Sequence, residues 1–485
     1  MVPYEIIAQD FSGGKSSVPL LSEDRLFPAD PAARAIARAL YASVKDLPIV
    51  SPHGHTDPRW FAENANFQDP SQLMVVPDHY VFRMLFSQGI PLEKLGVPRV
   101  DGGAVETDPR AIWRLFAENY HLFRATPSRL WLDHTFQTLF GLDAGLSAKT
   151  ADLYYDTIDD CLRRDEYRPR ALFERFNIEV IATTEGALDD LKWHRQIRDS
   201  GWTGRVVTTY RPDAVIDPDF EGFRQNVKTF GEVTGYDTGT WQGYLAAHAK
   251  RRAFFREHGA TATDHGHATA DTANLSAEAA AKLFGIVTSR DATPDEARLF
   301  RAQMLTEMAK MSVEDGMVMQ IHAGSRRNHS ADIFARFGRD KGFDIPGRTD
   351  YVGALKPMLD VVGLEPGLTI ILFTLDETAY GRELAPLAGV YPCLKLGPAW
   401  WFFDSAAGMR RFRDMTTETA GFYNTVGFND DTRAFPSIPA RHDVARRVDC
   451  AYLADLVIGG QLHEDEAADL AHDLAYRLAK RAYRL

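Results

Sequence analysis

Two histidines separated by one residue, His53 and His55, end the apolar stretch 47–55. Alternate side chains of a β-strand share a face, so both imidazoles would point the same way and supply two metal ligands. With 15 histidines among 485 residues, one such pair arises readily by chance. Its meaning therefore depends on whether the fold brings further ligands to the same place.

The elements that would position this pair alternate between strand and helix along most of the chain. Apolar strands are predicted at 47–55, 178–184, 205–210, 260–264, 317–322, 368–374, 391–396 and 422–428, with helices such as 294–311 between them. This alternation indicates a parallel sheet covered on both faces, and eight strands predict an α/β fold of the (β/α)8 TIM-barrel type. An open doubly wound sheet is the alternative, but no Gly-rich phosphate motif follows any predicted strand.

A large α-helical insertion is predicted after the first strand. The stretch 59–177 has helix-length segments at 109–122, 127–140 and 147–164 and no convincing strand, with apolar residues 113, 116, 131, 136 and 140 expected in its core. The chain then divides into three parts. They are 1–58 (a Gly- and Ser-rich arm, a helix opened by Asp30 and Pro31, and barrel strand one), 59–177 (the insertion), and 178–485 (the remaining barrel and C-terminal helices).

Polar residues gather at the predicted strand ends, which converge on the active site of such a barrel. Strand eight would place Asp430 or Asp431 beside His53 and His55, because the first and last strands are neighbours when a barrel closes. Nitrogen and oxygen ligands predict one divalent metal ion, with Zn²⁺ favoured and Mn²⁺ or another ion compatible. A second pair, His265 and His267, lies past a short strand, where a loop position is favoured over a ligand role for His267.

The composition narrows the classes of function. A net charge of −12 argues against nucleic acid or an anionic membrane as partner. Three widely spaced cysteines support neither a disulfide framework nor a Cys-rich zinc site. No signal or membrane-spanning segment is evident, so a cytoplasmic protein is expected. An anionic substrate would need positive charge from the site, and Arg211, Arg327 and Arg433 all follow strand ends.

An ordered set of motifs runs along the chain: His53-x-His55, Asp78-His79-Tyr80 with Arg83, Asp264-His265-Gly266, His322-x-Gly324 with Arg327, Trp400-Trp401-Phe402 and Asp431-Thr432-Arg433. As a set, these motifs resemble those of the uronate isomerase (glucuronate isomerase) family of amidohydrolase-like metal-dependent barrels. Thr432 stands where Ser is usual in that family, and Glu185-Gly186 stands where an acidic pair followed by Pro is common, which leaves the role of Glu185 open.

The resemblance implies aldose–ketose isomerisation of D-glucuronate to D-fructuronate, and of D-galacturonate to D-tagaturonate, through an enediol at a mononuclear metal site. It also implies a homo-oligomer acting on a small uronic acid. The implied metal ligands are His53, His55 and Asp431; the implied catalytic residues are Tyr80, Arg433, His79 and Asp431; and the implied substrate-binding residues are Arg327, His322, Trp400, Arg211 and Asp264.

Several of these roles carry physical conditions. Tyr80 and Arg433 are poor bases near pH 7, so a proton-transfer pair made of them needs mutual pKa depression. Trp400 either stacks on the sugar or packs in the core, and its place after strand seven favours the site. Trp401 beside it is then expected to point elsewhere and pack. The role of His265 is left open.

A metal-dependent hydrolase or deaminase of the amidohydrolase superfamily is the alternative. A binuclear hydrolase would need a Lys after strand four and a His after strand six, where the chain has Asp264-His265 and Thr374-Leu375-Asp376. A deaminase-like site often has Glu at the position of Ser325. A catalytically inactive protein that only binds sugar acids would tolerate loss of the Tyr80 and Arg433 pair, yet both residues are present.

Overall fold

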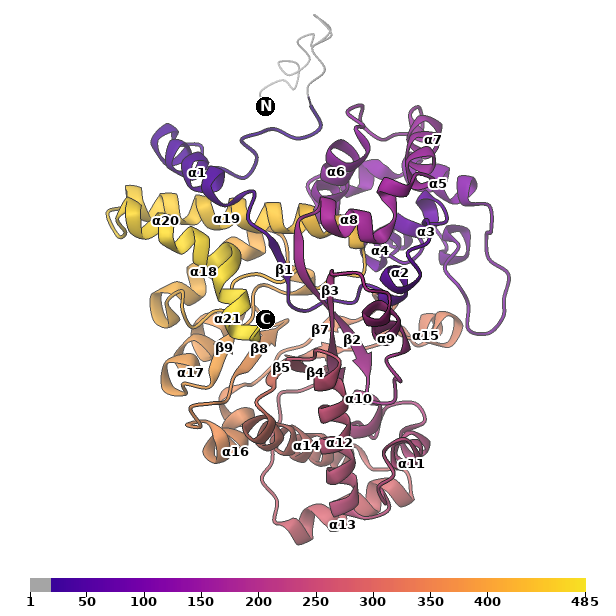
Figure 1. Cartoon of the computed structure of the whole chain (residues 1–485), viewed down its shortest axis with the longest axis vertical. Helices are drawn as coiled ribbons and strands as arrows, with labels where there is room; N and C mark the ends of the chain where they lie inside the picture. Colours follow the sequence, from indigo (N-terminus) through magenta and orange to yellow (C-terminus); the bar gives the residue numbers. More distant parts are fainter. Residues whose placement is uncertain (1–18) are drawn as a thin grey trace, which may run out of the picture.

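A parallel sheet of seven strands forms the centre of the molecule (Figure 1). The structure is a computed structural model that describes residues 19–485, so the Gly- and Ser-rich stretch 12–17 lies outside the described residues. The strands follow one another across the sheet in the order β1 (Ile49–Ser51), β2 (Ile178–Gly186), β3 (Arg205–Arg211), β4 (Ala262–His265), β5 (Val318–Ala323), β8 (Ile370–Thr374) and β9 (Leu394–Leu396). The predicted α/β fold of TIM-barrel type is confirmed.

The eighth position of the barrel is filled by irregular chain, so the prediction of a strand at 422–428 is wrong. Leu396 of β9 exchanges backbone hydrogen bonds with Asn424 and Val426 at 2.8 and 3.1 Å. On the other side the His55 N–H donates to the Thr432 carbonyl at 3.0 Å. Between these contacts Gly427 adopts a φ of 75°, which leaves the extended region and interrupts the ladder. Residues 424–432 thus close the ring without forming a strand.

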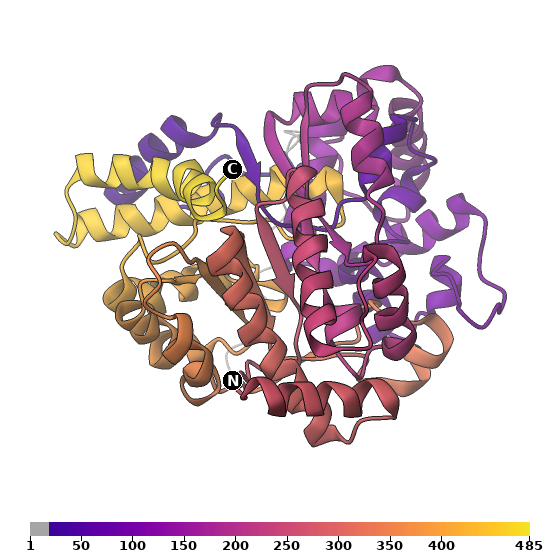
Figure 2. The same cartoon turned by 60° about the horizontal axis from the view of Figure 1, so that its bottom comes forward.

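Only helices lie between β1 and β2 in the described chain, as predicted for 59–177, although the division into domains stays a prediction. The prolines that open most of them occupy the first helical turn, where the missing N–H costs nothing. They form one group beside the sheet in both views (Figures 1 and 2). The helices are α2 (Pro58–Glu63), α3 (Pro70–Met74), α4 (His79–Ser87), α5 (Pro109–Glu118), α6 (Pro127–Phe140), α7 (Ala151–Leu162) and α8 (Pro169–Arg175).

Helices follow the later strands and cover the sheet (Figure 2). The capping box of Thr293 and Glu296 opens the longest of them, α14, as the sequence predicts. These helices are α9 (Lys192–Asp199), α10 (Asp213–Ile216), α11 (Phe223–Thr234), α12 (Trp241–Glu257), α13 (Ala277–Ser289), α14 (Pro294–Asp315), α15 (Ala331–Phe337), α16 (Val352–Val362), α17 (Ala385–Val390), α18 (Ala406–Ala420), α19 (Ile438–Ile458), α20 (Glu464–His472) and α21 (Leu478–Tyr483).

A helix near the start of the described chain packs against a helix from its C-terminal part. Asp30 caps α1 (Pro31–Val44) by accepting from two backbone N–H groups, and α1 packs along α19. A short antiparallel strand pair that the sequence did not predict, β6 (Ser325–Arg326) with β7 (Ile345–Pro346), follows β5. No helix in residues 19–485 has the length and apolarity that a bilayer crossing requires.

The two largest clusters of the hydrophobic core lie around the sheet and in the helical insertion. Trp113, Phe116, Phe136 and Phe140 belong to the second cluster, as predicted. Trp131 instead packs with the barrel cluster, where it joins the insertion to the sheet. This contact fixes the insertion above the strand ends.

Candidate active site

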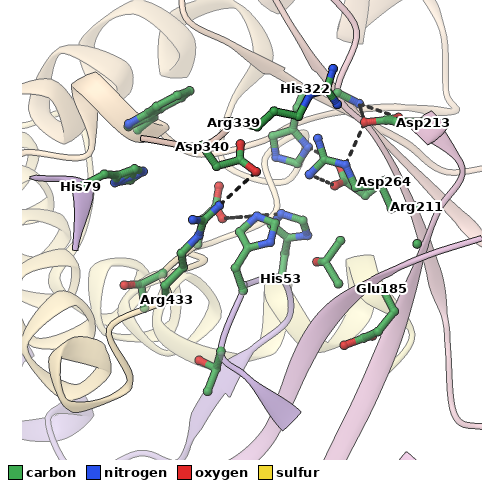
Figure 3. A pocket seen from close by; sticks show the side chains of 18 of the residues that line it. His53, His79, Glu185, Arg211, Asp213, Asp264, His322, Arg339, Asp340 and Arg433 are labelled. Atoms are coloured by element: carbon green, nitrogen blue, oxygen red, sulfur yellow. Dashed lines mark hydrogen bonds and ion pairs between the residues drawn. The ribbon is translucent and has the colours of Figure 1, made fainter. Parts of the chain in front are cut away.

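A cavity of about 690 Å³ opens at the carboxyl ends of the strands (Figure 3). Its walls come from strand ends of the barrel and from α4 of the insertion, so both parts contribute side chains. All residues predicted to act as metal ligands, catalytic groups or substrate contacts lie in its wall: His53, His55, His79, Tyr80, Arg211, Asp264, His322, Arg327, Trp400, Asp431 and Arg433.

Imidazoles and a carboxylate meet at the floor of this cavity. The Nε2 atoms of His53 and His55 lie 3.6 and 3.3 Å from Asp431 Oδ1. Burial lowers the pKa of His53 to about 4, so its ring is neutral at pH 7 and keeps a lone pair for a ligand. Burial opposes ionisation of Asp431, but the neighbouring His53 and His55 bring its pKa below the usual value. This group has the charge and donor atoms of a metal site.

Asp430 and Asp431 point to different places. Asp430 Oδ2 lies 3.0 Å from His442 Nε2 on α19, away from the cavity. Asp431 has a φ of 35°, an uncommon value for a residue other than glycine, and lines the cavity. The competition between the two aspartates for a cavity role is therefore decided by geometry in favour of Asp431.

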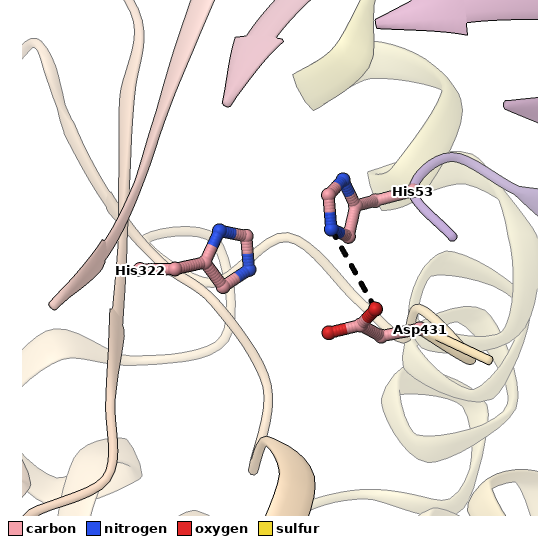
Figure 4. A group of neighbouring side chains, drawn as sticks. All are labelled: His53, His322 and Asp431. Atoms are coloured by element: carbon pink, nitrogen blue, oxygen red, sulfur yellow. Dashed lines mark ion pairs between the residues drawn. The ribbon is translucent and has the colours of Figure 1, made fainter. Parts of the chain in front are cut away.

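His322 joins the group although the sequence suggested a substrate contact for it. His53, His322 and Asp431 each offer a ligand atom, and these atoms lie within 4.8 Å of one another (Figure 4). The Nδ1 atom of His322 is 2.6 Å from Asp264 Oδ1, and its buried Nε2 has no hydrogen-bond partner in the described residues. A carboxylate behind an imidazole is the usual arrangement that orients a metal-ligating histidine.

The three predicted arginines are each held by carboxylates. Arg211 Nε lies 2.8 Å from Asp213 Oδ2, and its Nη1 lies 3.1 Å from Asp264 Oδ2. Burial disfavours the charged guanidinium, but these two carboxylates raise the pKa of Arg211 above its ordinary value. Arg211 is therefore a fixed positive charge in the cavity wall.

Arg327 and Arg433 share one carboxylate that the sequence did not single out. Asp340 lies 3.7 Å from Arg327 and 3.6 Å from Arg433, and Asp344 lies 3.3 Å from Arg327. Burial opposes ionisation of Asp340, yet Arg433 and Arg327 lower its pKa to about 2. No local motif marks Asp340, because it lies in the long connection between β6 and β7.

Tyr80 and His79 reach the cavity from the first turn of α4. Asp78 caps this helix by accepting from the Tyr80 N–H at 2.9 Å. The Tyr80 hydroxyl donates to Asp404 Oδ2 at 2.8 Å, and the Trp401 carbonyl lies 3.0 Å from it. Burial and the nearby Asp404 raise the pKa of Tyr80 well above 10, which is the opposite of the depression that a Tyr80–Arg433 base pair needs.

Both tryptophans line the cavity. Trp400 is almost fully buried and meets His322 edge to face, with ring centroids 4.7 Å apart. Trp401 stacks on His79 at a centroid distance of 5.6 Å, so it packs against a cavity residue instead of pointing away as predicted.

Glu185 and the second histidine pair complete the surroundings. Burial raises the pKa of Glu185 to about 8, and the Thr208 hydroxyl donates to its carboxyl. Asp213, His265 and His267 also offer ligand atoms within 4.8 Å of one another; the two histidines are buried, and Asp213 is partly exposed in the cavity wall. His267 lies in a loop, as predicted, but is buried. Arg211 already neutralises Asp213, so this second group lacks the free carboxylate of the first.

Comparison with known proteins gives one consistent result. The family model described as glucuronate isomerase matches residues 30–483. A uronate isomerase of Rhizobium meliloti (strain 1021) is 71% identical over 466 residues, 96% of this chain and 99% of the relative. The crystal structure of glucuronate isomerase from Caulobacter crescentus is 60% identical with a TM-score of 0.95, covering 96% of this chain and 97% of that one. A uronate isomerase structure from Thermotoga maritima is 28% identical with a TM-score of 0.88, covering 96% and 99%. The chain is an isomerase and belongs to the glucuronate isomerase family.

Proposed function

We propose that this enzyme interconverts D-glucuronate with D-fructuronate and D-galacturonate with D-tagaturonate. The observation that carries the proposal is one cavity whose wall combines four arginines with a largely buried histidine–aspartate group. Guanidinium groups bind a substrate carboxylate through paired hydrogen bonds, and the histidine–aspartate end faces the oxygens of the reacting carbons. A cytoplasmic location and a homo-oligomer stay predictions.

One divalent metal ion fits the donor set. His53 is neutral at pH 7, Asp431 is ionised, and the buried Nε2 of His322 has no partner among the described residues. His53, His55 and Asp431 would hold the ion, with His322 as a further candidate, and Zn²⁺ is favoured over Mn²⁺ by the nitrogen ligands. When bound, the ion supplies Lewis-acid stabilisation of negative charge on substrate oxygens.

The reaction moves a proton from C2 of the open-chain aldose to C1 of the ketose through an enediol. Arg327 and Arg211 hold the carboxylate end of the sugar. Tyr80, with Arg433 and His79 close by, takes the proton from C2 and returns it at C1. Asp431 lies where it can move the hydroxyl proton between the two oxygens. Trp400 and Trp401 shield the reacting carbons from water.

The direct test is NMR of glucuronate incubated with the protein in D2O. We expect fructuronate to form, and a sugar that stays an aldose with its C2 proton intact contradicts the proposal. Removal of metal by a chelator should abolish turnover, and one equivalent of Zn²⁺ or Mn²⁺ should restore it. Activity that survives complete metal removal contradicts the metal site.

Two substitutions test the proton-transfer group. Tyr80→Phe and Arg433→Met should each lower kcat by about 10²–10⁴-fold, the usual contribution of a positioned acid or base, while metal content stays unchanged. Tyr423→Phe and Arg410→Met are matched controls, because those side chains lie on exposed ion-pair networks outside the cavity. Full activity in Tyr80→Phe or Arg433→Met removes that residue from the mechanism.

A further inference from the structure

The hydroxyl of Tyr80 is paired with a buried carboxylate that the sequence did not identify. Asp404 follows the short helix η6 (Trp401–Phe403), is 8% exposed, and its Oδ2 accepts the Tyr80 hydroxyl at 2.8 Å. Asp404 does not line the cavity, so Tyr80 stands between it and any substrate. The phenol proton therefore points away from the cavity and its oxygen lone pairs are left for the substrate side.

Arg441 holds this carboxylate in place. Arg441 lies on α19, and its Nη1 donates to Asp404 Oδ2 at a distance of 2.9 Å. Its guanidinium lies 3.6 Å from the ring centroid of Trp131. The other oxygen, Oδ1, is buried and has no hydrogen-bond partner among the described residues. The carboxylate thus receives less hydrogen bonding than a permanently ionised buried group requires, and burial raises its pKa to about 6.

Tyr80 alone does not explain the removal of a proton from carbon. Burial raises the pKa of its hydroxyl well above 10, so tyrosinate is scarce at neutral pH. A neutral phenol accepts a proton only if its own proton leaves at the same time. Among the described residues, Asp404 is the group that accepts a hydrogen bond from that proton through a side chain.

We propose that Asp404 is the proton acceptor behind Tyr80, so that Tyr80 acts as a relay between substrate and carboxylate. The C2–H bond breaks and its electron pair stays on the substrate as the enediolate. The C2 proton bonds to the Tyr80 oxygen while the Tyr80 O–H bond breaks and that proton bonds to Asp404 Oδ2. The same steps in reverse deliver a proton to C1. Asp404 acts through Tyr80 and is a positioning residue, and the inference rests on the proposed isomerase function.

Asp404→Asn separates proton acceptance from geometry. The amide oxygen can accept from both Tyr80 and Arg441 as Oδ2 does, and the amide nitrogen takes the place of Oδ1, which lacks a partner. The variant keeps the shape and the hydrogen bonds but cannot take up a proton. We expect kcat for glucuronate to fall by about 10²–10⁴-fold while KM changes less than about threefold. Release of label from [2-²H]glucuronate should fall with kcat.

A matched control exists elsewhere in the chain. Tyr423 donates to Asp473 Oδ2 at 2.9 Å and Arg477 Nε lies 2.7 Å from Asp473 Oδ1, so Asp473→Asn alters another Tyr–Asp–Arg group far from the cavity lining. It should leave kcat unchanged. The double variant Tyr80→Phe/Asp404→Asn should be no slower than the slower single variant, because both act on one proton path.

The outcomes are distinct. A wild-type protein that forms no ketose refutes the proposed function itself. If the wild type is active, two results overturn only the relay. One is an Asp404→Asn variant that keeps more than a third of the wild-type kcat; the other is a double variant in which the losses of the two single variants multiply.

If Asp404→Asn does not fold, the wild-type pH profile decides. The relay requires kcat to decline as pH falls through about 6, because a protonated Asp404 accepts nothing. The groups facing Asp404 are Tyr80 and Arg83 of α4, Arg441 of α19 and Asp431. A kcat that is flat from pH 5 to 8 overturns the relay.

Discussion

The substitution Asp264→Asn tests whether His322 is a metal ligand. Asp264 Oδ1 lies 2.6 Å from His322 Nδ1 and its Oδ2 lies 3.1 Å from Arg211 Nη1. Arg211 has only donors, so an amide at position 264 must turn its oxygen to Arg211 and its NH2 to His322. His322 Nδ1 then accepts a hydrogen bond, and the ring proton moves to Nε2. The lone pair needed for a metal is lost.

The expected cost follows from this tautomer change. Loss of a carboxylate that orients a ligand histidine lowers metal affinity by about 10–100-fold, or about 1.4–2.8 kcal/mol. Competition against a chromogenic chelator measures the Kd of the metal-free protein for Zn²⁺. Asp213→Asn is the matched control, since it removes the same charge beside the same arginine, at 2.8 Å from Arg211 Nε, without contacting His322. Its Kd should change less than about threefold.

Two results would refute this reasoning. An unchanged Kd in Asp264→Asn would mean that His53, His55 and Asp431 hold the ion without His322. An equal loss in both variants would mean that the net charge of the wall controls affinity, and not the orientation of the His322 ring.

Two further predictions concern stability. Glu185 has a folded-state pKa of about 8 against 4.5 for the free side chain, so unfolding releases its proton and wild-type stability falls as pH rises between these values. The Gln side chain of Glu185→Gln does not titrate. The free energy of unfolding of this variant, measured by urea titration and compared with that of the wild type, should therefore rise by about 1.4 kcal/mol per pH unit from pH 5 to 8. A difference that stays constant with pH contradicts the assigned pKa shift. Arg413 and Asp449 form a buried two-bond ion pair between α18 and α19, at 2.7 and 3.1 Å. Asp449→Ala should cost about 3–5 kcal/mol, and Asp360→Ala, which removes the exposed partner of Lys356, less than about 1 kcal/mol by the same method. Equal losses of unfolding free energy in the two variants would show that burial does not determine how much these ion pairs contribute to stability.

Much of the barrel could be predicted because each strand carries its own signal. The apolar runs that end in His322 and Thr374 are buried along their whole length as β5 and β8. Polar residues at their ends then fall together without further information, since parallel strands converge at one edge. The irregular eighth position was missed because 422–428 has the apolar content of a strand, whereas Gly427 turns its backbone out of the extended region.

The residues that the sequence did not reveal act across long separations. Asp404 meets Tyr80 from the far end of the chain, and Asp340 meets Arg433 from a long connection with no periodicity. Neither aspartate lies at a strand end or in a spaced motif. The position of Trp131 in the barrel cluster likewise depends on how the insertion docks, which local pattern does not encode.

The closure of the ring between β1 and 424–432 affects how the protein assembles while it is synthesised. His53 is synthesised before the insertion and nearly all of the barrel, and Asp431 after them, so the growing chain lacks one ligand of the proposed metal site until its last barrel segment emerges. An ion held by the proposed ligands would bind across the seam that closes last and would add its binding free energy to the final step of assembly. In cells short of the metal, this seam would be the first part of the fold to open, and proteolysis would begin beside it.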